Sequence, residues 1–279
     1  MRDNTDPLEN LSRFSIPFRT PISLPVVSLV FETRPEMMPR IRQITEWHRK
    51  FFKFHREIII SNVDPFIPGT VFASCGTPPS PEMVGTWYSD MCVHHFASLC
   101  DAPYMLIWQW DGFVLNPEKW LDEFLNYDYV GAPLGGFWHT ASLWFEQNIP
   151  GWQNPYRTSD SFIGGQRVLA GNGGFSMRSK KFLDASNSLS RTGWAANAED
   201  LYLCLERRKE LEEKGVKFCP AEVAKFFSRD SAVQPPLEDL FGFHSRDILG
   251  EVKQYLESKY LTSPVPVNRS VSPLTTLSA

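Results

Sequence analysis

The sequence lacks any apolar run long enough to cross a membrane. Stretches such as 26–31 and 58–60 are far shorter than the ~20 residues that a bilayer requires. The first residues are polar and lead into a proline-containing segment, where a signal peptide would need an apolar core. We therefore expect a protein without a transmembrane segment, located in the cytoplasm.

Clusters of basic residues are also missing, and the formal charge is −4 at pH 7. Nucleic-acid binding draws on clustered lysine and arginine, so this composition argues against nucleic acid as a partner. The few cysteines show neither a CxxC pair nor a zinc-site spacing, so we interpret them as reduced structural residues. They are Cys75, Cys92, Cys100, Cys204 and Cys219.

The two ends of the chain differ in composition from the rest. Residues 1–24 carry several prolines among polar residues, which favours an N-terminal arm, and 262–279 is rich in Ser, Thr and Pro, which favours a flexible tail. No linker or internal repeat divides residues 25–261. We therefore expect a single domain over 25–261.

The first half of that domain reads as a βαβ unit. An apolar, β-branched strand at 25–31 precedes a helix-compatible segment at 40–54 and a second strand at 57–61. Such units form α/β sheets that bind ligands at the carboxyl ends of their strands. Polar residues directly after the two strands are therefore expected near a nucleotide. They are Glu32, Thr33 and Arg34 after the first strand, and Asn62 and Asp64 after the second.

A third strand at 104–108 follows a predicted helix at 84–99 and leads into Gln109-Trp110-Asp111-Gly112. A carboxylate at the end of a central strand is costly to leave unpaired, so Asp111 is expected to meet a cation, a donor or solvent. The alternative is that Asp111 caps a helix predicted over 117–126, although Asn116 is better placed for that cap.

An ordered set of motifs follows this strand. It comprises Tyr127-Asp128-Tyr129-Val130-Gly131-Ala132-Pro133, Ala170-Gly171-Asn172-Gly173-Gly174-Phe175-Ser176-Met177-Arg178, Ala198-Glu199-Asp200 and Phe241-Gly242-Phe243-His244. With Trp108-Gln109-Trp110-Asp111, the set resembles the glycosyltransferase-like family catalogued as domain of unknown function 5672, over about 25–250. The resemblance implies a single Rossmann-like, nucleotide-sugar-binding domain of the A-type glycosyltransferase kind, with a mixed central sheet flanked by helices.

The resemblance also implies a divalent metal, Mn²⁺ or Mg²⁺, on the sugar-nucleotide diphosphate. Asp111 stands where the A-type family holds this cation, and Gln109 replaces the first of the two aspartates of the commoner motif. In similar enzymes a late histidine completes the metal shell, which implies His244; the alternative is an ordinary surface or core histidine. Arg178 and Lys225 are candidates for the charge of the diphosphate.

Gly171, Gly173 and Gly174 surround Asn172, and three residues without a Cβ in four positions indicate tight turning or close approach of the backbone to a ligand. Exposed N–H groups here could bind a sugar or phosphate oxygen, and the Asn172 amide could bind the donor sugar. The alternative is an ordinary turn between strands.

Glu199 and Asp200 precede an apolar, helix-compatible segment, so both carboxylates lie in a first helical turn. In inverting A-type enzymes the second acid takes the proton of the acceptor hydroxyl, which implies Asp200 as the base beside Glu199. With an ordinary pKa, Asp200 would be a weak base in the ground state. A charge pair at a helix start is the alternative.

These residues predict transfer of a sugar from a nucleoside diphosphate sugar, by default of uridine diphosphate, to a hydroxyl on a glycan or other acceptor. Inversion is favoured because no second nucleophilic carboxylate is evident near Asp111. Two other functions stay open. A non-catalytic carbohydrate-binding module would use the 21 Phe and 9 Trp, and a glycoside hydrolase would use Asp111 and Asp200 as its carboxylate pair.

Overall fold

The computed structural model describes most of residues 11–261; the gaps are at 15, 17–19, 77–79, 81–82, 136, 158, 160–161, 164, 194 and 230–234. The expected tail at 262–279 and residues 1–10 of the expected arm lie outside the described residues. None of the described helices is long and apolar enough to cross a bilayer.

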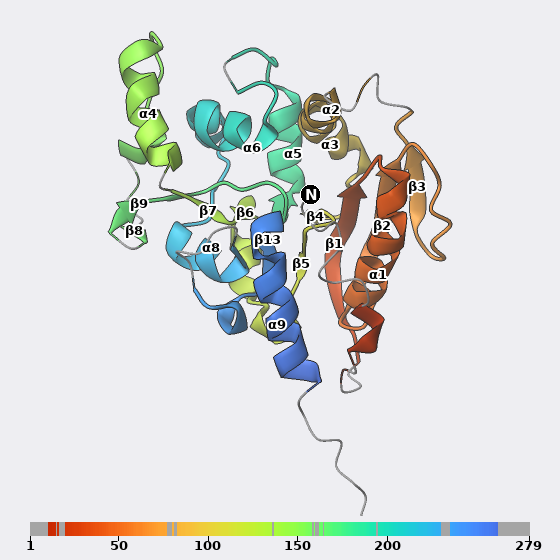
Figure 1. The fold of residues 1–279 in the computed structure, drawn as a ribbon. Coiled ribbons are helices and arrows are strands. Elements are labelled where there is room, and N and C mark those ends of the chain that lie inside the picture. The colour runs from red at the N-terminus through yellow and green to blue at the C-terminus, as the bar shows by residue number, and fades with distance from the viewer. Residues whose placement is uncertain are drawn as a thin grey trace, which may run out of the picture.

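The centre of the molecule is a six-stranded mixed sheet with the order β3-β2-β1-β4-β11-β6 (Figure 1). Its strands are β1 (Ile22–Phe31), β2 (Phe52–Ser61), β3 (Val71–Ser74), β4 (Tyr104–Trp108), β6 (Tyr129–Gly131) and β11 (Ser176–Ser179). Strands β1 to β4 run parallel, whereas β11 is antiparallel to β4 and β6. The parallel part has the strand order of a Rossmann half-sheet, which reverses between β1 and β4. The α/β class with a mixed central sheet is therefore confirmed.

The boundary between the first helix and the second strand differs from the predicted one. Helix α1 spans Met38–Arg49 and β2 begins at Phe52, although the sequence predicted helix up to residue 54. Phe52 and Phe54 are buried while Lys53 between them is exposed. This is the two-residue period of a strand, and it overrides the helical spacing of the preceding residues.

Strand β1 begins at Ile22, inside the expected N-terminal arm. Its pairing with β2 shifts register between Leu24 and Val27, around Pro25, because proline has no N–H to donate to a neighbouring strand. Earlier in the same arm, Leu11 and Phe14 are buried in the core, and the Phe14 ring lies 6.3 Å from that of Trp47. The described part of the arm therefore contributes to the core.

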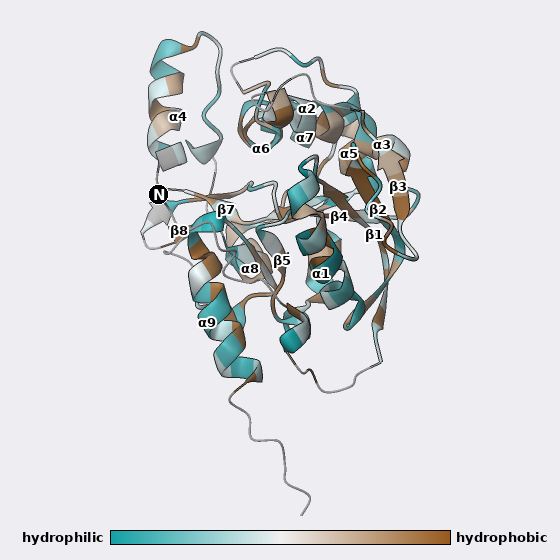
Figure 2. Ribbon diagram, turned by 45° about the vertical axis from the view of Figure 1, so that its right-hand side comes forward, coloured by the Kyte–Doolittle hydropathy of each residue, from teal (hydrophilic) through white to brown (hydrophobic). Residues whose placement is uncertain are grey.

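Helices cover both faces of the sheet. On one face α1 packs with α8 (Ala221–Phe227) and α9 (Leu249–Tyr260). The other face carries α2 (Val84–Asp90), α3 (Phe96–Leu99), α5 (Lys180–Asn187), α6 (Glu199–Leu201) and α7 (Arg208–Glu213). Figure 2 shows the central strands as hydrophobic, with hydrophilic residues on the outer sides of the helices. A parallel sheet buried on both faces requires such strands.

Two of the covering helices contain a π-helical turn. Met91–His95 lies between α2 and α3, and Tyr202–Glu206 lies between α6 and α7. The helix predicted over 84–99 is therefore present, but its middle is wider than an α-helix. Cys92 of the first turn and Cys204 of the second belong to one buried cluster, so both turns contribute to the same part of the core. Turns of this kind often occur at functional sites.

The segment 117–126, predicted as a helix, forms two short 3₁₀ turns, Pro117–Lys119 and Asp122–Asn126. Asn116 does not cap the first of them. Its buried amide donates to the carbonyl oxygens of Leu237 and Leu240, both at 2.7 Å. Asn116 therefore ties β5 to the later chain, a long-range role that the local cap pattern does not contain.

Small sheets lie beside the central one. Strand β5 (Gly112–Val114) pairs with β13 (Gly242–His244), which also pairs with β12 (Ser228–Arg229). The other pairs are β7 (Pro133–Leu134) with β10 (Leu169–Ala170) and β8 (Phe162–Ile163) with β9 (Gln166–Arg167). Helix α4 (Phe137–Asn148) lies at the periphery of the molecule, on the same side as β8 and β9 (Figure 1). The β5–β13 pairing places His244 opposite Gly112 and hence beside Asp111.

Candidate functional site

The candidate site lies where β1 and β4 end side by side. These strands are parallel neighbours at the point where the strand order reverses, and ligands of open α/β sheets bind in the crevice outside such a point. The predicted residues 32–34 follow β1, and 109–111 follow β4. Thr33 is buried between its two charged neighbours. The fold therefore brings two of the predicted groups to one edge.

Arg34 is an exposed cation at this edge. Its Nε and Nη2 atoms donate to Glu32 Oε1 and Oε2 at 2.8 and 2.7 Å, and its guanidinium lies 5.2 Å from the centre of the Trp110 ring. Hydrogen bonding to Glu32 raises the pKa of Arg34, so the guanidinium keeps its charge. The Arg34 side chain is 46% exposed, whereas that of Glu32 is 6% exposed. Arg34 can thus meet an anion while Glu32 orients it.

Asn62 and Asp64 follow β2, the strand next to β1, as predicted. Both side chains have local partners: Asn62 Oδ1 accepts from the Ser61 hydroxyl at 3.4 Å, and Asp64 Oδ1 accepts from the Phe66 backbone N–H at 2.8 Å. Both residues are half-buried. They lie one strand away from Arg34, and these contacts shape the loop after β2.

Asp111 and His244, which are far apart in the sequence, meet at the predicted metal position. His244 Nε2 lies 3.5 Å from Asp111 Oδ1 and 3.1 Å from Gln109 Oε1. Asp111 Oδ1 is buried, and no described residue hydrogen-bonds to it. A carboxylate, an imidazole and an amide oxygen thus converge on one point, and this donor set suits a divalent cation. Among the described residues no group of three or more His, Cys, Asp and Glu could hold a metal, so other ligands would have to complete the shell.

The three predicted glycines are buried, and protein side chains lie directly against them. A Cβ on Gly174 would fall 2.1 Å from His244 Nε2, one on Gly173 would fall 2.1 Å from Glu199 Oε1, and one on Gly171 would fall 2.4 Å from Leu134 Cδ1. None of the three has a positive φ. The Gly171 and Gly174 N–H groups donate to Ala132 O and Asn172 Oδ1, so the expectation that they are exposed to a ligand is wrong. The glycines are needed because His244 and Glu199 approach the backbone closely.

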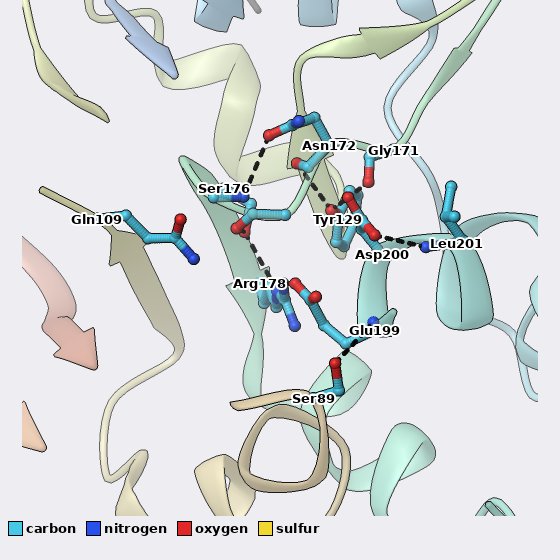
Figure 3. Close-up of polar contacts among 12 residues, drawn as sticks. Ser89, Gln109, Tyr129, Gly171, Asn172, Ser176, Arg178, Glu199, Asp200 and Leu201 are labelled. Atoms are coloured by element: carbon cyan, nitrogen blue, oxygen red, sulfur yellow. Dashed lines mark hydrogen bonds and ion pairs between the residues drawn. The ribbon is translucent and has the colours of Figure 1, made fainter. Parts of the chain in front are cut away.

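Asn172 belongs to the same segment, and its side chain also serves the backbone. Its Oδ1 accepts from the Gly174 N–H at 3.1 Å, and its carbonyl accepts from the Tyr129 hydroxyl at 3.0 Å (Figure 3). Asn172 as a whole is half-buried. The segment 171–174 thus lies between His244 on one side and Glu199 on the other.

Arg178 is fully buried, which corrects its expected contact with the diphosphate. Its Nη2 lies 3.0 Å from Glu199 Oε1, its Nε donates to the Ser176 hydroxyl at 3.2 Å, and 0% of its side chain is exposed. A guanidinium sealed in the core cannot reach a ligand in solvent. It balances the buried Glu199 carboxylate instead, because an unpaired charge there would be strongly destabilising. Lys225, the other candidate cation, lies in α8 over the Phe226 ring.

Glu199 and Asp200 begin α6 as predicted, but their environments differ. Glu199 is buried against Arg178, whereas Asp200 is half-buried and accepts hydrogen bonds from the N–H groups of Leu201 and Gly173. Burial, and then the charge of Glu199, raise the pKa of Asp200 to about 7. The ordinary pKa expected from the sequence is therefore wrong, and Asp200 is better matched to accept a proton near neutral pH.

Several residues that sequence reasoning missed hold this acidic pair in place. The Ser89 hydroxyl accepts from the Glu199 N–H at 3.2 Å, and the Cys92 thiol lies within hydrogen-bonding reach of Arg178. Both come from the helix before β4, and Figure 3 shows Ser89 beneath Glu199. Neither residue belongs to a motif, so the only signal is the helical position that places them on the same side of the sheet as α6.

The fold and this site define an α/β protein of the Rossmann-like kind, with an acidic and basic cluster at the switch point of its sheet. The family described as "Protein of unknown function (DUF5672)" matches residues 87–244. The chain belongs to this family, which confirms the resemblance inferred from the motifs.

Solved structures with distant similarity include a glycosyltransferase involved in the glycosylation of the major capsid of PBCV-1. It is 11% identical with a TM-score of 0.44, over 84% of this chain and 98% of that chain. HddC from Yersinia pseudotuberculosis is 14% identical with a TM-score of 0.30, over 58% of this chain and 79% of that one. No curated protein matches the sequence.

Proposed function

We propose that the chain is a metal-dependent glycosyltransferase that moves a sugar from a nucleoside diphosphate sugar to an acceptor hydroxyl with inversion. The observation that carries this proposal is the convergence of Asp111, His244 and Gln109 at the β1–β4 switch point, one glycine segment away from Asp200. A cation-binding group and a carboxylate with a raised pKa therefore flank the same segment of the chain.

Asp111 and His244 would hold Mn²⁺ or Mg²⁺, with Gln109 as a further oxygen donor. The buried Asp111 Oδ1, to which no described residue hydrogen-bonds, supports this assignment, since such an atom requires a partner. When bound, the cation would offset the charge that develops on the departing diphosphate. Arg34, which is exposed and charged beside Trp110, would contact the same diphosphate. Uridine is the proposed nucleoside.

Asp200 would take the proton of the acceptor hydroxyl. The hydroxyl oxygen forms a bond to the anomeric carbon, the bond from that carbon to the diphosphate oxygen breaks, and its electron pair leaves on the diphosphate. Because attack comes from the face opposite the leaving group, the anomeric configuration inverts. The pKa of about 7 supports this role, because the carboxylate is available at neutral pH and still a useful base.

The test is calorimetric titration of nucleotide sugars, UDP-glucose first, with and without Mn²⁺. We expect Mn²⁺-dependent binding that Asp111→Asn abolishes, because the amide keeps the shape and removes the charge. Asp184→Asn is the matched control, since Asp184 is an exposed carboxylate of α5 paired with Lys180. Equal Mn²⁺-dependent binding by the Asp111 variant would contradict the assignment. Cleavage of oligosaccharides without a nucleotide sugar would identify a hydrolase instead.

A further inference from the structure

A cavity of about 830 Å³ lies away from the cluster of Asp111 and His244. Its volume falls in the range of about 300 to 1,000 Å³ that is typical of small-molecule sites. Two segments and Gly193 line it: residues 149–155 follow α4 directly, and residues 205–210, 212 and 213 run from the second π turn into α7. Nothing in the reaction proposed above uses these residues.

The cavity is connected to the proposed base through one helix. Asp200 lies in α6, and the same helix continues through Tyr202–Glu206 to the cavity residues Leu205 and Glu206. Leu201, next to Asp200, and Trp138 of α4 both pack against the apolar cluster that contains Leu205. The element that carries the base therefore also forms a wall of the cavity, and α4 is held against it.

One aromatic ring lines the α4 side of the cavity, and two further rings of α4 follow behind it. Trp152 lines it and is half-buried, and its ring lies edge-on to that of Phe145, with centroids 5.7 Å apart. Phe145 in turn contacts Trp144, which is 58% exposed. The half-buried Trp152 indole offers a flat apolar surface to the cavity, which matches the C–H face of a pyranose ring.

Three cations and four carboxylates line the cavity, so its lining carries a small negative net charge. Each cation that lines it has its own carboxylate partner, so none is left to attract a phosphate or sulfate. The pairs are Arg208 with Glu212 at 3.0 Å, Lys209 with Glu213 at 3.7 Å and Arg207 with Glu210 at 3.8 Å. The fourth carboxylate, Glu206, accepts from the Ala195 N–H at 2.8 Å. Such a lining favours an uncharged, polyhydroxylated ligand.

We propose that this cavity is the acceptor subsite and that it takes a neutral oligosaccharide. The proposal rests on the proposed function, because it assumes that Asp200 activates an acceptor hydroxyl. The sugar would stack on Trp152, the tryptophan that lines the cavity, and its hydroxyls would hydrogen-bond the paired side chains of α7. The oligosaccharide would lie along the helix, with its terminal sugar nearest Asp200.

The experiment fills the cavity without touching the predicted catalytic residues. Gln153 lines the cavity and is exposed, so Gln153→Trp should occupy it without disturbing the core. Gln147→Trp is the matched control, since Gln147 is an exposed glutamine of α4 outside the lining. The probes are maltotriose, cellotriose, mannotriose and chitotriose, with a sulfated disaccharide as the anionic comparison, observed by saturation-transfer NMR.

We expect at least one neutral trisaccharide to bind the wild type and Gln147→Trp, and Gln153→Trp to weaken that binding at least tenfold. In transfer assays Gln153→Trp should raise the acceptor KM, while donor affinity and donor hydrolysis without acceptor stay within about twofold of wild type. Binding of the sulfated sugar alone, absence of all binding, or an unchanged acceptor KM would overturn the subsite. Sugar binding that Gln153→Trp removes, without any turnover of a nucleotide sugar, would instead refute the proposed function and leave a carbohydrate site.

Discussion

At the level of single residues, Asp200 differs from an ordinary aspartate in the energy of its charged form. It loses solvent at the start of α6 and lies next to the buried carboxylate of Glu199, and both effects favour the protonated state. Its N–H partners oppose this shift only in part. A carboxyl group with these neighbours changes charge within the physiological range.

We predict that Asp200→Asn retains donor affinity but loses about 100- to 10,000-fold in transfer rate, because the amide cannot take the proton. For the wild type the rate should rise with pH and level off above about 7, as the carboxyl loses its proton. Single-turnover transfer at saturating donor between pH 5 and pH 9 measures both effects. Near-normal transfer by the variant, or a product that retains the donor configuration in its NMR spectrum, would contradict the inverting mechanism.

Glu199 is a positioning residue, and its charge sets the pKa of its neighbour. Glu199→Gln should destabilise the fold by about 3 kcal/mol, because the buried Arg178 loses its counter-charge. It should also lower the pKa of Asp200, since one negative charge beside it disappears while Arg178 remains. The transfer rate should then rise at lower pH than in the wild type. A merely structural residue would leave that profile in place. An unchanged pH profile would therefore refute the positioning role.

At the level of elements, the segment 171–174 is the link between the two halves of the site. Its backbone passes between His244 on β13 and Glu199 on α6, at distances that exclude even a methyl group. Shifting this segment would move the proposed metal ligand and the acidic pair together. The glycines around Asn172 thus set the distance between His244 and Glu199.

Gly174→Ala tests this link. The added Cβ must displace the His244 ring, so we expect a loss of about 1 to 3 kcal/mol in stability and weaker Mn²⁺-dependent donor binding. In Gly174→Ala/His244→Ala the ring is gone, and the stability loss due to the alanine at 174 should largely vanish. Gly250→Ala is the control, since a Cβ there meets nothing within 4 Å. Additive losses in the double variant, measured by urea unfolding, would show that the ring and the glycine do not interact.

At the scale of the whole molecule, two titratable groups with shifted pKa values act on stability in opposite directions. His48 is buried in α1, where its Nε2 accepts from the Val114 N–H at 3.1 Å, and burial lowers its pKa to about 3. Below about pH 6.5, His48 therefore binds a proton in the unfolded state but stays neutral in the folded state. The stability of the fold then decreases as the pH falls. Asp200 behaves in the opposite way: its raised pKa makes the folded state less stable as pH rises from about 4 to about 7.

These linkages predict opposite pH dependences for two variants. His48→Gln keeps an acceptor for Val114 and cannot titrate, so it should gain about 2 to 3 kcal/mol relative to wild type between pH 6.5 and pH 4.5. Asp200→Asn should be most stable relative to wild type above pH 7, and the difference should shrink towards pH 4. Chemical unfolding across this range measures both. Parallel stability curves for wild type and His48→Gln would show that His48 is not buried as a neutral ring.

The sequence by itself determined the first half of the fold and one edge of the site. The strand at 104–108 was also predicted, but only the tertiary structure places it beside β1. The apolar, β-branched strands at 25–31 and 57–61, joined by one helix, predict parallel neighbours, as β1 and β2 are. This inference needs only periodicity and the right-handed crossover, which are local properties. The helix start at Glu199 and Asp200 is equally local. The boundary at Phe52 was mispredicted because helical and strand spacing overlap there.

Only the tertiary structure decided which side chains meet and which are sealed from water. Asp111 finds His244 because β5 pairs with β13, and Arg178 finds Glu199 because β11 and α6 pack on one core. Such contacts depend on the path of the whole chain. The pKa of Asp200 is a further case, since it follows from the solvent that folding removes and the charge that folding brings near. A sequence pattern can identify the carboxyl group, but its pKa depends on desolvation, which is a property of the folded molecule.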